Sequence, residues 1–165
     1  MRAGTIGAIG VGVCVFLIGG GSVARADSGC KTVRGKILEV QIPAPNDPFG
    51  RVVGTVTGAI NGSASAILTS LVPGAEPGTL EATTQDIFVT KKGDMLVTTG
   101  NATFTFVDAN TVSDVLTLEV DGAASTGRFA GATGTIVATG FGFNLGAGPG
   151  QTYFQLEYKG EVCRP

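Results

Sequence analysis

The alternation of apolar and polar residues over short runs is the feature that most constrains how this chain can fold. In the segment 115–121, the apolar residues Leu116, Leu118 and Val120 recur at every second position. Successive side chains of a β-strand point to opposite faces, so this spacing gives one apolar and one polar face. From residue 33 onward the sequence has no sustained apolar repeat at helical spacing, and the chain's 27 glycines and 7 prolines disfavour long helices. The sequence therefore predicts an all-β fold.

Runs of this kind recur at the spacing typical of a β-sandwich or a β-barrel. They lie near 33–41, 51–60, 63–70, 81–90, 94–99, 102–107, 114–121, 134–143 and 152–162. We expect one neighbouring pair to form a single bent strand, which leaves eight strands. Residues 91–94 have the composition of a hairpin turn, and the segments 46–50, 72–78 and 146–150 are predicted loops.

The first 26 residues have the pattern of a secretory signal peptide. Arg2 gives a positive start, an apolar stretch without charged residues follows, and small residues flank the arginine of the segment 24–26. We therefore expect cleavage between Ala26 and Asp27, a mature domain over 27–165, and secretion. A transmembrane anchor is the alternative, but seven glycines dilute the apolar stretch and no cluster of Lys and Arg follows it.

Cleavage would make the chain more acidic. The chain has 11 basic and 13 acidic residues, and loss of Arg2 and Arg25 would leave nine basic residues and a net charge of −4. A basic stripe of the kind that binds phosphate backbones is missing from the sequence. We therefore expect neither nucleic acid nor stable membrane association after cleavage, and the sequence does not indicate an oligomeric state.

The two cysteines outside the signal peptide help to choose between barrel and sandwich. In an oxidising compartment such a pair most simply forms a disulfide, and two free thiols are the alternative. Cys30 precedes the first predicted strand and Cys163 ends the last one. In an up-and-down barrel with an even number of strands, the first and last strands pair antiparallel, which brings these two ends together. The cysteines thus favour a barrel whose seam is closed by a disulfide, stabilising by about 4–5 kcal/mol in the chain-entropy model.

A glycine motif late in the chain resembles a known family. The segment 127–134 has the form G-x-F-x-G-A-x-G, built on Gly127, Phe129, Gly131 and Gly134. It resembles the allene oxide cyclase-like and dirigent-like barrels, and the closing segment 158–163 is similar to the end of secreted bacterial members of that group. The resemblance covers chiefly residues 115–163. Small residues in such a motif let a sharp corner form between two strands around one buried phenylalanine.

This resemblance implies an eight-stranded antiparallel β-barrel with an apolar interior able to hold a small hydrophobic molecule. Characterised relatives cyclise an unstable fatty-acid epoxide or steer the radical coupling of phenols, and both work without a cofactor. The matching residues are structural, so the carboxylate and amide at the barrel floor of the plant cyclases have no assigned counterpart in this sequence. Candidates for lining a ligand cavity come from the apolar strand faces: Phe104, Phe106, Leu116, Leu118, Phe154, Leu156 and Tyr158.

Residue content excludes several common chemistries. The chain has no histidine, which rules out Ser-His-Asp and Cys-His catalysis and removes the commonest zinc ligand. The segment 108–114 gathers side-chain oxygens that calcium could use, but it lacks the glycine and terminal glutamate of calcium loops, so Asx residues shaping a turn are the preferred interpretation. The glycine-rich segments also depart from the phosphate-binding motifs. We expect neither a metal nor a cofactor.

Two acidic residues are the candidates for a catalytic role. Glu39 shares a strand face with Val33 and Ile37, and Asp86 shares one with Phe88. A carboxyl group inside an apolar barrel would have a raised pKa and could act as a general acid or base. The alternative is a hydrogen-bonded or hydrated position at the rim of the barrel.

Three functional classes therefore remain open. The first is a binding module for a small hydrophobic ligand, and the second is a cofactor-free isomerase or cyclase. The third is a structural or surface protein with a filled barrel. A dry apolar cavity would favour the first class, a cavity that also holds an unpaired carboxylate would favour the second, and a filled interior would favour the third.

Overall fold

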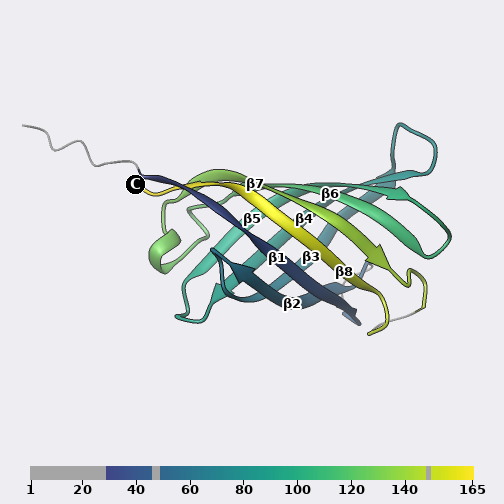
Figure 1. Cartoon of the computed structure of the whole chain (residues 1–165), viewed down its shortest axis with the longest axis horizontal. Coiled ribbons are helices and arrows are strands. Elements are labelled where there is room, and N and C mark those ends of the chain that lie inside the picture. Colours follow the sequence, from purple (N-terminus) through teal and green to yellow (C-terminus); the bar gives the residue numbers. More distant parts are fainter. Residues whose placement is uncertain (1–28, 46–48, 148–149) are drawn as a thin grey trace, which may run out of the picture.

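The computed structural model describes residues 29–45, 49–147 and 150–165, and these form one closed β-barrel (Figure 1). Each strand pairs antiparallel with its neighbours in the chain, and the last strand pairs with the first. The strands are β1 (Cys30–Ile42), β2 (Arg51–Gly58), β3 (Gly62–Pro73), β4 (Thr79–Thr90), β5 (Met95–Phe106), β6 (Thr111–Val120), β7 (Thr133–Phe143) and β8 (Tyr153–Cys163). The predicted all-β, eight-stranded antiparallel barrel is confirmed. The predicted signal peptide and its cleavage site at Ala26–Asp27 lie outside the described residues.

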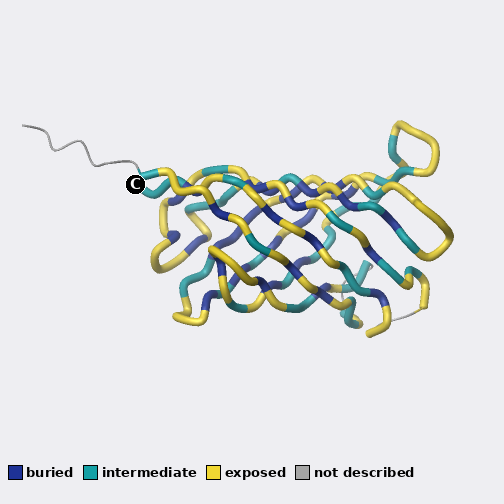
Figure 2. Tube along the Cα trace, viewed as in Figure 1, coloured by how far each residue is buried: buried dark blue, intermediate teal, exposed yellow. Residues whose placement is uncertain are grey.

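Two details of the strand prediction are also confirmed. The runs 94–99 and 102–107 form the single strand β5, and 91–94 form the turn between β4 and β5. Along the strands, buried and exposed residues alternate, as the tube in Figure 2 shows. The alternation in the sequence therefore separates the interior of the barrel from its outer wall. Among the described residues, no helix has the length and apolar character needed to cross a membrane.

The barrel closes where β1 meets β8. Cys30 and Cys163 are direct partners in the register of these strands, and a disulfide joins them. The pairing continues along the seam from this bridge to Val40 and Tyr153. The predicted disulfide at the closure seam is confirmed. Such a bond is typical of proteins in oxidising, extracytoplasmic compartments.

The glycine motif forms a corner beside this seam. Between β6 and β7 it makes the 3₁₀ turn η1 (Gly127–Phe129), in which the Phe129 ring is buried and stacks against the guanidinium group of Arg128. Gly127 has a φ of 59°, and a Cβ at this position would collide with the Asp94 carboxylate. Glycine is therefore needed here for both the backbone conformation and the close approach. The corner covers one end of the barrel.

We call the end that holds η1 and the disulfide the closed end. The opposite end, which holds the described loop residues 43–45, 49–50, 74–78, 107–110, 144–147 and 150–152, is the open end. The C-terminus marks the closed end in Figure 1. Large apolar side chains fill the closed end, and the most deeply buried are Val56, Ile60, Leu96, Leu118, Phe129 and Ile136. The Tyr158 hydroxyl also lies here, accepting a hydrogen bond from the Ile60 amide at 2.9 Å and donating one to the Thr57 carbonyl at 3.0 Å.

Candidate functional site

An apolar cavity of about 260 Å³ occupies the open end of the barrel. We call it the mouth cavity. Its lining comes from strands all around the barrel and from the loops of the open end: Gln41, Phe49, Gly50, Val52, Leu68, Leu71, Leu80, Phe104, Phe106, Val112, Leu145, Thr152 and Phe154. The Phe104 and Phe154 rings lie 6.4 Å apart at its inner side. These residues make a concave, largely hydrophobic surface of the kind that binds small molecules.

A second, smaller cavity of about 40 Å³ continues the mouth cavity toward the middle of the barrel. The two cavities share Val52, Leu68, Phe104 and Phe154, so they lie next to each other inside the barrel, and we call the two together the funnel. We call this smaller part the inner cavity. Its other lining residues are Glu39, Ala66, Thr84, Asp86, Ala102, Asp114, Leu116 and Leu156. The funnel thus changes from an apolar mouth to a carboxyl-lined inner end.

The three carboxyl groups of the inner cavity come from three separate strands. Glu39 lies on β1, Asp86 on β4 and Asp114 on β6, and each is buried. Side chains of a strand alternate between the two faces of the sheet, so a buried position on a barrel strand faces the interior. Each of the three acids therefore points inward. The register pairs Glu39 with Phe154 and Asp114 with Phe104, which places both acids beside the aromatic rings between the two cavities.

Hydrogen bonding differs among the three carboxyl groups. The Thr84 hydroxyl donates a hydrogen bond of 2.6 Å to Oδ2 of Asp86. Gly100 on the next strand leaves room for that hydroxyl, since a Cβ there would collide with Thr84 Oγ1. By contrast, Oδ1 of Asp114 is buried and has no hydrogen-bond partner among the described residues. A buried polar atom without a partner costs about 1–3 kcal/mol, which makes Asp114 a position where a ligand atom would stabilise the protein.

Burial shifts the acid–base behaviour of all three groups. The pKa of Glu39 is raised from 4.5 to about 8, chiefly by burial and further by the negative charges of Asp86 and Asp114. Burial also raises the pKa of Asp86 to about 7, against the opposing effect of the Thr84 hydrogen bond. The pKa of Asp114 is raised to about 7 by burial and by the charge of Asp86. Near neutral pH these groups can therefore both donate and accept protons.

The described residues provide no positive charge to balance this cluster. Of the side chains that line the inner cavity in the described part, only Glu39, Asp86 and Asp114 are ionisable. The ion pair between Lys36 and Glu157 lies on the exposed outer wall. No group of three or more Asp, Glu or Cys side chains in the described part has the geometry to hold a metal ion.

The structure places the two predicted catalytic candidates together. Glu39 and Asp86 both line the inner cavity, so neither occupies the hydrated rim that was the alternative. Their catalytic role stays a prediction. The sequence interpretation missed Asp114 as a site residue: Asp114 begins the predicted strand 114–121, but it was considered only among the side-chain oxygens of the segment 108–114. In fact β6 begins at Thr111, and the alternation with Leu116 and Leu118 was the signal that could have placed Asp114 inside the barrel.

The predicted lining residues divide between the two halves of the barrel. Phe104, Phe106 and Phe154 line the mouth cavity, and Phe104, Leu116, Phe154 and Leu156 line the inner cavity. Leu118 and Tyr158 line neither cavity and instead belong to the packed closed end. The turn between β5 and β6 covers only residues 107–110, and it agrees with the Asx interpretation, since Asp108 Oδ1 accepts a hydrogen bond from the Asn110 amide at 2.7 Å.

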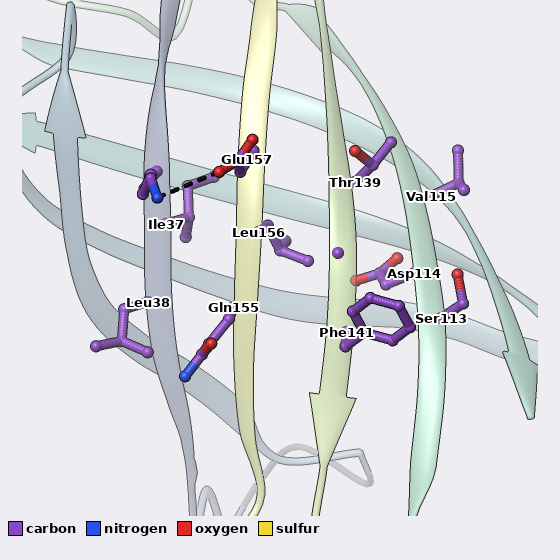
Figure 3. Close-up of a pocket in the computed structure, with 12 residues that line it drawn as sticks. Ile37, Leu38, Ser113, Asp114, Val115, Thr139, Phe141, Gln155, Leu156 and Glu157 are labelled. Carbon is purple, nitrogen blue, oxygen red and sulfur yellow. Dashed lines mark ion pairs between the residues drawn. The ribbon is translucent and has the colours of Figure 1, made fainter. Parts of the chain in front are cut away.

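A wider depression of about 630 Å³ lies on the outer wall over β1, β8, β7 and β6 (Figure 3). Its outward side chains are well exposed, with Leu38 49% and Phe141 45% accessible to solvent. The Lys36–Glu157 ion pair crosses it in the open. Asp114 appears among its labelled residues but is buried on the inward face of β6. This shallow surface offers less enclosure than the funnel, which is therefore the candidate site.

Comparisons with known proteins yield no match to a family model, a curated protein or a solved structure. The assignment of function therefore rests on the geometry of the barrel and its funnel.

Proposed function

We propose that this protein is a secreted barrel that binds a small hydrophobic molecule in its mouth cavity. The single observation that supports this function is the apolar cavity of about 260 Å³ at the open end. Ligand pockets commonly measure about 300–1,000 Å³. The volume of the mouth cavity lies just below that range, so it suits a small ligand. Secretion is supported by the signal-peptide pattern of the sequence and by the Cys30–Cys163 disulfide.

A second candidate function is a cofactor-free isomerase or cyclase. The observation that favours it is the group of three buried carboxyls at the end of an apolar funnel, with pKa values raised to about 7 and 8. Such groups can transfer protons within a substrate at neutral pH. The resemblance of the 127–134 motif to the allene oxide cyclase-like and dirigent-like barrels agrees with this chemistry, but it rests on structural residues of the motif.

Binding can be tested with the neutral fluorescent probe N-phenyl-1-naphthylamine. The wild-type protein should enhance its fluorescence in a saturable manner, because the apolar mouth cavity shields the probe from water. Leu68→Trp would fill the space where the two cavities join and should abolish the enhancement. Leu38→Trp on the exposed outer wall is the matched control and should leave binding unchanged.

The outcomes of this test separate the functional classes. Equal loss of binding in both tryptophan variants, or no enhancement by the wild type, would contradict a ligand-binding barrel and favour the structural alternative. For the isomerase, candidate substrates are incubated with the protein and analysed for products of unchanged mass and altered retention. Glu39→Gln should abolish such conversion while the probe still binds, because it removes an ionisable proton and preserves the size of the side chain.

A further inference from the structure

The inner cavity brings three ionisable carboxyl groups to the end of an apolar space. Glu39, Asp86 and Asp114 reach it from β1, β4 and β6, so the three carboxyls surround it from different walls of the barrel. They are near enough for the charges of Asp86 and Asp114 to act on Glu39, and for that of Asp86 to act on Asp114. Since the described lining has no Lys or Arg, a cationic group of a ligand would be the direct countercharge for carboxyls that ionise there.

Asp114 supplies an independent sign of a binding site. Its side chain is only 4% exposed, and Oδ1 has no hydrogen-bond partner in the described part of the protein although it lines the inner cavity. A carboxylate oxygen accepts hydrogen bonds, so the ligand group it requires is a donor. Charged donors form shorter and stronger bonds to carboxylates than neutral donors do.

The size of the inner cavity restricts the donor further. A volume of about 40 Å³ accommodates one group of roughly the size of a water molecule. A primary ammonium group is compact and carries three donors, whereas a guanidinium group is a larger planar fork. Phe104 and Phe154 also line the inner cavity, and aromatic rings attract cations that lie over their faces.

We propose that the barrel binds a small primary amine, with its ammonium group among Glu39, Asp86 and Asp114 and its apolar body in the mouth cavity. This inference rests on the proposed function, because it identifies the class of ligand for the same funnel. Binding of the cation stabilises the ionised carboxyls, so it is coupled to the release of protons from them. The described groups that line the inner cavity beside the carboxyls are apolar, apart from the Thr84 hydroxyl that hydrogen-bonds to Asp86. The buried Thr98 is the direct partner of Asp86 in the register of β4 and β5 and brings a second hydroxyl group close to that acid.

A series of ligands with one chain length tests this inference. Octylamine, octanol and octanoic acid are compared by isothermal titration calorimetry at about pH 7.5, where an aliphatic amine is charged. Octylamine should bind at least about ten-fold more tightly than octanol, since its donors are charged. Octanoate should bind most weakly because its carboxylate has the same negative charge as the ionised carboxyl groups of the site. Between about pH 6 and 8.5 the affinity for octylamine should rise as the carboxyls ionise, while that for octanol stays constant.

Two variants and a control localise the effect. Asp114→Asn and Glu39→Gln should each remove most of the preference for octylamine and leave octanol binding in place, which also shows that the barrel is folded. Glu81→Gln removes an exposed carboxyl on the outer face of β4 and should change neither ligand's affinity. Equal affinities for octylamine and octanol, or tighter binding of octanoate, would overturn the amine proposal and leave the proposed function intact. If none of the three ligands binds, the proposed function fails as well.

Discussion

The two ends of this barrel have the same backbone architecture and opposite interiors. At the closed end, which also holds the disulfide and η1, the side chains of Leu96, Leu118 and Ile136 are almost completely buried. At the open end the same strands surround a funnel whose inner wall holds three carboxyl groups. Stability and binding are thus separated along the barrel axis. A densely packed end can hold the strands in register while the other end keeps a cavity that costs packing energy.

The two ends together show how this barrel can bury ionisable side chains: the stability of the closed end offsets the cost of burying acids at the open end. Three acids on the inner face destabilise the folded protein whenever they ionise, because burial disfavours the charged form. The closed end offsets that cost with apolar contacts and a covalent bond.

The largest effect should follow from loss of the bridge at the closed end. Cys30→Ser combined with Cys163→Ser removes a disulfide that spans 133 residues of sequence. The free energy of unfolding should fall by up to about 4–5 kcal/mol, as the unfolded chain gains freedom. Urea denaturation of the variant and the wild type measures this loss. An unchanged midpoint would mean that the paired strands β1 and β8 hold the seam without the bridge.

A somewhat smaller effect on the free energy of unfolding should come from a rise in pH, which ionises the buried acids at the open end. The folded protein keeps the Glu39 proton up to about pH 8, whereas the unfolded chain releases it near its ordinary pKa of 4.5. The contribution of this group to stability is therefore complete below that ordinary pKa and is lost as the pH rises toward 8. The loss is about 1.4 kcal/mol per pH unit for each proton, or about 4 kcal/mol over three units for Glu39 alone.

Thermal unfolding at about pH 5, 6.5 and 8 checks this dependence. The wild type should be least stable at the highest pH, and Glu39→Gln should flatten the profile because glutamine stays neutral. Glu81→Gln on the outer wall is the matched control and should keep the wild-type slope. A wild-type stability that increases between pH 5 and 8 would contradict the buried, protonated state of the three acids.

The smallest effect is the difference in stability lost when a leucine at each end of the barrel is replaced by alanine. Leu118→Ala removes a fully buried side chain from the closed end and should lower the free energy of unfolding by about 3 kcal/mol. Leu71→Ala, at a partly buried position that already borders the mouth cavity, should cost only about 1 kcal/mol. Denaturant titration of both variants measures the difference. Equal losses would show that the mouth is packed as tightly as the closed end.

Several features of the site could be predicted from local pattern, and others could not. The alternation around Glu39 and Asp86 allowed an inward position for both, because strand side chains change face at every residue. Asp114 was missed, since Asp108, Asn110 and Ser113 nearby also favour a turn and the start of a strand is poorly marked by such residues. Leu118 and Tyr158 share faces with true lining residues, but they lie nearer the closed end.

By itself the sequence determined the class of fold and its closure. Alternating apolar residues require strands with one buried face, the glycine-rich turns connect them, and Cys30 and Cys163 mark two ends that a closed barrel joins. Which inward residues lie at the same height along the barrel depends on the three-dimensional fold. Glu39, Asp86 and Asp114 are far apart in the chain and on strands that do not pair with one another, so the sheet register and the closure bring them together. The period of two encodes the face of each residue, whereas its height along the barrel axis depends on the pairing of all eight strands.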